Sequence, residues 1–345
     1  MKNYCIFELA ALAALTFASC SSESVEDFGG NQASQQVAIG FDGYLGRSAV
    51  DTRGTESTTE TIQGEGKGFG VFGNYTSESG VSSSPVVLFD NQHVTYETSK
   101  WTYSPVKYWP TAGHIDFYAY APYVKPKTLS GTKFDFTVSN NVADQIDLLW
   151  ANAKNQTKAN NSGKNKVNFT FKHALAKIGY SVTSTNNDAS TTITVTSIKL
   201  VGSENGLTNA FYTKGTIDLS KADNKANDLW VTASADTKQN FDWRSSDLTL
   251  STAKHESPDY LFVIPQDFSG TTTDQLYVVV EYTVKTTDNS NIIEIKNKVS
   301  QKITKDFEQG KAYMINLKIG LTPIEFNAEV SSWPKAEDID GIEWN

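Results

Sequence analysis

The chain has 345 residues and a net charge of −9. This acidic balance, without any block of Lys and Arg, excludes nucleic acid as an expected partner, because such binding depends on neutralising phosphates. Hydrophobic residues make up 39% of the chain, enough for sizeable cores, and the only two cysteines, Cys5 and Cys20, leave the rest of the chain without a disulfide framework or a cysteine-based metal site.

Residues 1–20, MKNYCIFELAALAALTFASC, have the pattern of a secretory signal. Lys2 supplies the positive start, and the apolar run that follows is too short to span a bilayer comfortably. Cys20 ends this segment, as the lipid-modified cysteine of a bacterial lipobox does, so it is the candidate lipidation site. The alternative is an ordinary signal that happens to contain a cysteine. Residues 21–36 are polar and without periodicity, which predicts a flexible tether.

The body of the chain carries short segments in which apolar and polar residues alternate, and these predict β-strands. Residues 275–284 are almost all β-branched or aromatic and are expected to form a central strand buried on both faces. Residues 144–151 suit either a helical turn or a strand. The other strand segments are VAIGFDGYL at 37–45, KWTYSPVKYW at 100–109, HIDFYAYAPY at 114–123, KFDFTV at 133–138, VNFTF at 167–171, AYMINLKIGL at 312–321 and IEFNAEVSSW at 324–333.

Polar, turn-rich gaps separate these segments. Many short strands with polar gaps predict an all-β protein built from antiparallel β-sandwiches. We place the seam between two tandem sandwich domains in the long polar loop at 151–166. This gives an N-terminal domain over 37–172 and a C-terminal domain over 173–345.

Residues 64–75, GEGKGFGVFGNY, contain the GxGxxG spacing of a phosphate-binding loop at Gly68, Gly70 and Gly73. Such a loop must lead into a helix, whose N-terminus meets the phosphate. Here NYTSESGVSSSP follows, which has no helical period and ends in Pro85. We therefore expect a strand in which the glycines permit bulges or close packing, and no nucleotide cofactor.

No local motif for catalysis or metal binding occurs. The histidines form none of the HxH, HxxxH or HExxH patterns, and there is no GxSxG nucleophile motif. His114 and Asp116 could share one strand face, but two groups make a poor metal site. We expect no enzyme, no metal and no cofactor; a catalytic set assembled from distant residues is the alternative.

Four aromatic residues crowd together around Pro105: Trp101, Tyr103, Tyr108 and Trp109. Stacked aromatic rings can bind sugars, so Trp101, Tyr108 and Trp109 are candidates for a glycan platform. The same residues can fill a core instead, because Trp101 and Tyr103 share a strand face. A surface glycan-binding lipoprotein is therefore the alternative function.

Together, several stretches resemble the fimbrillins of Bacteroidetes, the Mfa-like and FimA-like pilins of type V fimbriae. The similarity runs over nearly the whole chain and depends on the order and spacing of the motifs. They are the lipobox signal, VAIGFDGYL, DTRG, GKGFGVFGNY, KWTYSPVKYWPTAGHIDFYAYAPY, DLLWA, VNFTFKHALAKIGYSV and AYMINLKIGLTPIEFNAEVSSW. The resemblance implies two transthyretin-like β-sandwich domains and a lipoprotein precursor that reaches the outer membrane.

The resemblance also implies assembly by strand exchange. In the family, an arginine-specific protease cuts after the first strand, and a strand of the next subunit fills the vacated groove. Arg53 in DTRG matches the family's Thr-Arg-small position; Arg47 in LGRS and an uncut protein are the alternatives. Val37, Ile39 and Phe41 alternate as a removable strand requires, because alternate side chains fix the register of β-augmentation.

The incoming strand is expected from the C-terminus, where Ile324, Phe326 and Val330 alternate. The alternative is a last strand that stays in its own sandwich. Head-to-tail contacts of this kind build filaments. The expected partners are other fimbrial subunits, the outer membrane through the lipid anchor, the protease, and receptors on host or bacterial surfaces. The predicted function is a structural, adhesive subunit of a surface-exposed fimbria, with stalk, tip and anchor positions all open.

Overall fold

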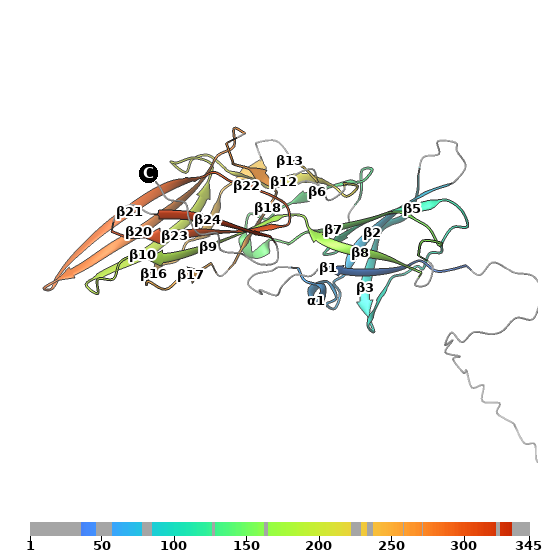
Figure 1. The fold of residues 1–345 in the computed structure, drawn as a ribbon, viewed down its shortest axis with the longest axis horizontal. Coiled ribbons are helices and arrows are strands. Elements are labelled where there is room, and N and C mark those ends of the chain that lie inside the picture. Colours follow the sequence, from blue (N-terminus) through green and yellow to red (C-terminus); the bar gives the residue numbers. More distant parts are fainter. Residues whose placement is uncertain are drawn as a thin grey trace, which may run out of the picture. The chain divides into compact units, whose positions relative to one another are not determined.

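The computed structural model describes residues 36–45, 57–77, 85–125, 128–161, 165–221, 229–232, 237–257, 259–270, 272–321 and 325–332. All elements below lie in the compact unit Val37–Asn345. They are almost all strands, which confirms the predicted all-β class (Figure 1). The described helical elements are α1, Thr59–Ile62, and a 3-10 turn, Val142–Asp144. Neither is a long apolar helix of the kind that crosses a membrane.

A seven-stranded sheet carries the first strand at its edge, in the order β1-β8-β7-β5-β2-β3-β4. Its pairs are antiparallel except for β1 and β8, which run parallel. Parallel neighbours require a long connection, and β1 and β8 are separated by five strands of the same sheet. The bounds are β1 Gly40–Leu45, β2 Phe69–Thr76, β3 Val86–Glu97, β4 Lys100–Thr102, β5 His114–Ala121, β7 Leu149–Gln156 and β8 Lys166–His173.

Two five-stranded sheets share a second core. One has the order β15-β10-β20-β21 with β16 beside β10, and the other has the order β17-β9-β23-β24 with β18 beside β9. Here β9 and β23 are parallel, a second departure from the antiparallel sandwich expected. The bounds are β9 Ala176–Ser184, β10 Thr191–Val201, β15 Phe241–Arg244, β16 Leu248–Thr249, β17 His255–Glu256, β18 Leu261–Val263, β20 Leu276–Asp288, β21 Asn291–Ile303, β23 Lys311–Ile319 and β24 Glu325–Ser332.

Three smaller sheets complete the described strands, in the orders β13-β12-β6, β11-β14 and β19-β22. The bounds are β6 Lys133–Thr137, β11 Phe211–Tyr212, β12 Lys214–Asp218, β13 Trp230–Thr232, β14 Lys238–Gln239, β19 Gln266–Asp267 and β22 Asp306–Phe307.

The buried apolar residues form two clusters. The first core takes its members from between Ile39 and Phe171, and the second core from between Phe72 and Ile319. Strand β5 serves both, because successive side chains point to opposite faces: Phe117 lies in the first core, and Tyr118 and Tyr120 lie in the second. A domain border near residue 172 stays a prediction, and β6, which precedes that border, pairs with β12, which follows it.

Several predicted segment bounds differ from the observed ones. The polar run at 151–166 is expected to be a loop, but β7 continues to Gln156. Its polar side chains are accommodated, because Lys154 and Asn155 are exposed and Asn152 donates to the Leu219 carbonyl. In the segment 100–109 only β4 is a strand. The strand predicted at 275–284 is confirmed as the central strand β20, between β10 and β21. The predicted burial on both faces is wrong, because Tyr277, Glu281 and Thr283 on one face are only partly buried. The alternatives for 144–151 both apply in part, because the 3-10 turn ends at Asp144 and β7 begins at Leu149.

The glycine-rich stretch is part of a strand, as expected. Gly70 and Gly73 lie in β2, and a Cβ on Gly70 would be 2.4 Å from the Tyr120 ring, so only glycine fits there. The ladder between β2 and β3 shifts register beside Gly73, which is the predicted bulge.

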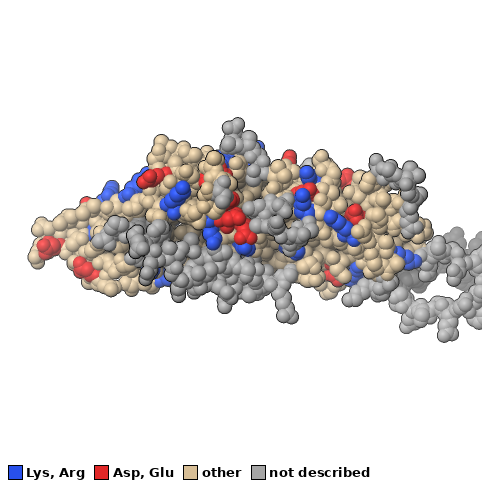
Figure 2. Space-filling view, turned by 45° about the horizontal axis from the view of Figure 1, so that its top comes forward, with Lys and Arg blue, Asp and Glu red and all other residues tan. Residues whose placement is uncertain are grey.

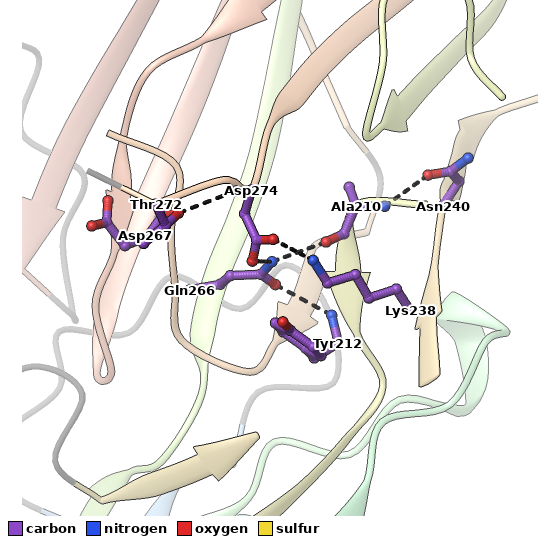
Figure 3. A network of polar contacts seen from close by, with 8 residues as sticks. All are labelled: Ala210, Tyr212, Lys238, Asn240, Gln266, Asp267, Thr272 and Asp274. Carbon is purple, nitrogen blue, oxygen red and sulfur yellow. Dashed lines mark hydrogen bonds and ion pairs between the residues drawn. The ribbon is translucent and has the colours of Figure 1, made fainter. Parts of the chain in front are cut away.

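A polar network lies in the second part of the chain (Figure 3). Buried Gln266 donates through Nε2 to the Ala210 carbonyl (3.0 Å) and to Asp274 Oδ2 (2.7 Å), and its Oε1 accepts from the Tyr212 N–H (3.2 Å). Lys238 pairs with Asp274. The network ties β11, β14 and β19 together, because Tyr212, Lys238 and Gln266 come from these three strands.

Candidate functional site

The first strand lies in a slot between two other segments. On one side, β1 pairs with β8 over its whole length. On the other side, the Ile39 N–H donates to the Lys107 carbonyl (2.8 Å), and the Trp109 N–H donates to the Val37 carbonyl (2.9 Å). Removal of this strand would leave unpaired backbone groups along both walls of the slot.

The inward side chains of the first strand fill the first core. Ile39 and Phe41 are each 1% exposed, Leu45 is buried, and Val37 packs against the same cluster. Each such side chain contributes about 1.5–3 kcal/mol when fully buried. The rings around Phe41 are those of Phe89, Tyr103, Phe117 and Phe169, with centroids 5.3–5.8 Å away.

Position 43 must be small. A Cβ on Gly43 would lie 3.0 Å from the Phe69 ring and 3.1 Å from the Phe171 ring. An alanine is therefore tight, and a larger side chain would displace one of the rings. The slot thus offers four side-chain positions, at residues 39, 41, 43 and 45, that are medium, large, small and medium in size.

The hydroxyl of Tyr103 closes the slot. It donates to the Ile39 carbonyl (2.7 Å) and accepts from the Lys107 N–H (3.2 Å), so it joins the first strand to the opposite wall. Burial raises the pKa of this hydroxyl above its usual value, and the hydrogen bond with the Lys107 backbone offsets part of that rise. The sequence analysis placed Tyr103 among the aromatic residues but did not find this contact.

The chain downstream of the slot is anchored by a buried pair. The Ser57 N–H donates to Asp147 Oδ2 (2.9 Å), and the Ser57 hydroxyl donates to the Asp147 carbonyl (3.0 Å). His173 Nδ1 lies 2.9 Å from Asp147 Oδ2. The N–H of Leu45 donates to Thr59 Oγ1 (3.1 Å), so residues on both sides of 46–56 are held. Sequence analysis missed Asp147, although a carboxylate in the apolar run IDLLW is the signal that could have found it.

Other predicted site residues fall outside the described part. Cys20, Arg47, Arg53 and Ile324 lie there, so their roles stay predictions. Phe326 and Val330 belong to β24, whose backbone pairs antiparallel with β23 at a sheet edge.

The three glycan candidates do not form a shared exposed surface. Trp101 is 8% exposed and Trp109 is 6% exposed, and both belong to the first core. Tyr108 is 47% exposed and pairs through its backbone with Ala38. The indole rings therefore belong to the first core rather than to a sugar platform.

Metal-binding side chains do not gather in the described part of the chain. Among the described residues, no group of three or more His, Cys, Asp or Glu side chains could hold a metal ion. On the face seen in Figure 2, acidic and basic residues are interspersed among large uncharged areas. The first-strand slot is the candidate site.

The chain is similar to known fimbrial proteins. A family model described as fimbrillin-like matches residues 52–333. The fimbrium subunit Fim1C of Phocaeicola vulgatus is 28% identical over 386 residues, covering 96% of this chain and 97% of the relative. A crystal structure of a fimbrial protein from Bacteroides vulgatus ATCC 8482 has a TM-score of 0.66 and 25% identity, and the match covers 86% of this chain and 99% of that one.

Proposed function

The chain belongs to the fimbrillin-like family, and from this premise we propose that it is a structural subunit of surface fimbriae that polymerises by strand exchange. A partner's strand would replace residues 37–45 in the slot. The observation that carries the proposal is the position of the first strand at the N-terminal end of the fold. Residues 40–45 pair with β8, residues 37 and 39 bond to the segment 107–109, and the inward side chains are buried.

The distribution of arginine supports cleavage behind the first strand. The chain has three arginines, Arg47, Arg53 and Arg244. The first two follow β1 directly, whereas Arg244 lies in β15 and donates from Nε to the Tyr180 hydroxyl (2.9 Å). An arginine-specific protease therefore has its sites concentrated where a cut would free the first strand. We propose Arg53 as the main site and Arg47 as the second.

The sequence of β24 supports its donation. Residues 39–45 are IGFDGYL and residues 324–330 are IEFNAEV. Aligned in the same direction, they place Ile on Ile, Phe on Phe, Ala on Gly and Val on Leu at the four slot positions. This order matches the medium, large, small and medium sites. Pro323 aligns with Ala38, whose N–H makes none of the hydrogen bonds described across the slot.

Anchoring and adhesion complete the proposal. Lipid on Cys20 would hold the precursor at the outer membrane, because buried acyl chains contribute about 0.8 kcal/mol per methylene. A filament built from such subunits would carry its exposed surfaces away from the cell, where they can meet receptors on host or bacterial surfaces. Lipid anchoring, the protease and the receptors are proposed partners of the same assembly.

The proposal is tested by cutting the purified chain with a limiting amount of an arginine-specific protease. We expect a cut after Arg53 and a ladder of SDS-resistant oligomers on unheated gels. Arg53→Lys should slow the ladder, Arg53→Lys with Arg47→Lys should abolish it, and Arg244→Lys serves as the matched control that leaves it unchanged. A clean cut without oligomers would contradict strand exchange.

Donation by β24 has its own test. A peptide of residues 320–332 should bind the cut chain but not the uncut one, and its Phe326→Asp variant should fail to bind. Deletion of residues 322–345 should leave cleavage intact and abolish the ladder. If the deleted chain still polymerises, another strand is the donor.

A further inference from the structure

The β20–β21 hairpin exposes apolar side chains on its core-facing side. Ile303, Val299, Ile295 and Ile293 share one face of β21, with Gln301 and Asn297 between them. Ile303 is buried and Val299 packs on the second core, but Ile295 and Ile293 are 55% and 56% exposed. The apolar side chains on this face of β21 therefore extend beyond the part that the second core covers, and Ile295 and Ile293 are left exposed.

The end of β23 lies at the same end of its sandwich as this patch. The Ile319 carbonyl accepts from the Thr185 N–H, and the Ser190 carbonyl accepts from the Thr287 N–H. The short connection from β9 to β10 therefore links the C-terminal end of β23 to the turn end of the hairpin (Figure 1). Leu321, just beyond β23, is 60% exposed. We name Ile293, Ile295 and Leu321 the hairpin-end patch.

The alignment of β24 with the first strand determines which surface of the second copy lies near this patch. If Phe326 takes the place of Phe41, then Thr322 takes the place of Val37. Gly320 and Leu321 alone separate the donor's Ile319 from that position. Three chain steps span at most about 11 Å. The acceptor's surface around Val37 then lies close to the donor's Leu321, at the end of the sandwich that carries the hairpin-end patch.

The acceptor surface at that point is apolar as well. Val106 is 50% exposed and Tyr108 is 47% exposed, and they flank Lys107, whose carbonyl binds the start of the strand in the slot. On the basis of the proposed strand exchange, we propose that the hairpin-end patch of one copy docks on Val106 and Tyr108 of a second copy. This second interface orients successive subunits and speeds exchange, because it holds the donor strand close to the slot.

One test separates docking from strand binding. Ile293→Glu with Ile295→Glu should slow protease-triggered polymerisation by about tenfold or more, because a carboxylate at an apolar contact is unfavourable. The matched control is Ile292→Glu, since Ile292 is equally exposed but lies on the opposite face. Binding of the 320–332 peptide to the cut double variant should stay unchanged, because the peptide brings no hairpin.

A second test locates the contact. Copies with Val106→Cys and copies with Ile295→Cys, both with Cys5 and Cys20 replaced by Ser, are mixed, cut and treated with a short bismaleimide. We expect a cross-link between the two kinds of copy within the ladder. Normal polymerisation of the double variant, or a full ladder without the cross-link, would overturn the docking while leaving strand exchange in place. Failure of the peptide to bind the wild-type cut chain would overturn both.

Discussion

The ring of Phe41 stacks on that of Phe169 at a centroid distance of 5.8 Å and an interplanar angle of 19°. Phe169 lies in β8, the parallel partner of the first strand, so the same pair of strands is joined by backbone and by side chains. The contact makes Phe41 the main anchor of the segment that we propose to be exchangeable. Its strength sets how firmly the uncut chain holds its own strand.

Phe41→Ala should therefore weaken the uncut chain. Loss of a fully buried Phe side chain costs about 3–5 kcal/mol, because a cavity remains among the surrounding rings. The free energy of unfolding from urea denaturation measures this effect. Tyr44→Ala on the same strand is the control, since Tyr44 is 49% exposed, and it should cost less than about 1 kcal/mol. Equal losses would show that Phe41 is not the anchor.

Asp147→Ala should loosen the chain downstream of the slot. The substitution removes the acceptor for the Ser57 N–H and the partner of His173, both at 2.9 Å. Removing one member of a buried pair costs about 3–5 kcal/mol. Hydrogen exchange at the Ser57 amide should rise together with the loss of stability. Asp90→Ala, at an exposed position of β3, is the control, and unchanged exchange at Ser57 would contradict the assignment.

Lys238→Met should destabilise the protein more than Lys298→Met does. Both lysines pair with a carboxylate, but the side chains of Lys238 and Asp274 are 13% and 18% exposed, whereas those of Lys298 and Glu281 are 56% and 44% exposed. The first substitution leaves the largely buried carboxylate of Asp274 short of its cationic partner and should cost about 2–4 kcal/mol, against about 0–1 kcal/mol for the exposed pair. Thermal unfolding of both variants decides the comparison.

Stability should fall at alkaline pH through Tyr120. Burial raises the pKa of its hydroxyl to about 12, and hydrogen bonds to Val124 and Asn91 offset part of the rise. The pKa in the folded state lies above the unfolded value of about 10. The stability linked to the protonated hydroxyl is therefore complete below pH 10 and is lost as the pH rises towards 12.

Tyr120→Phe checks this pH dependence. The variant loses the hydroxyl's hydrogen bonds and should be about 1 kcal/mol less stable at pH 7. Its denaturation midpoint should then fall less than that of the parent chain between pH 10 and pH 12, because the titrating group is gone. Equal slopes for the two proteins would rule out Tyr120 as a source of the alkaline loss.

The strands of the slot could be predicted because their alternation is local. Ile39 and Phe41 are separated by one residue, and a period of two states which side chains share a face. This alternation does not show which other strand pairs with the first strand. The parallel partner of β1 follows it by more than a hundred residues, so sequence alone did not identify Phe169 as the neighbour of Phe41.

Polar contacts between distant residues were the main omission. Ser57, Asp147 and His173 are unremarkable one by one, and only the fold brings their side chains together. The indole rings of Trp101 and Trp109 illustrate the opposite difficulty. An aromatic cluster has the same composition in a core and on a surface, so burial had to be observed.

Strand β5 gives the protein one further property. Phe117 touches Phe41 on one side of this strand, while Tyr118 and Tyr120 on its other side belong to the second core. Removal of the first strand therefore takes Phe41 away from Phe117 in β5, a strand whose side chains belong to both cores. A subunit emptied in the proposed way should melt as a whole at a lower temperature, and binding of a replacement strand should raise that temperature again.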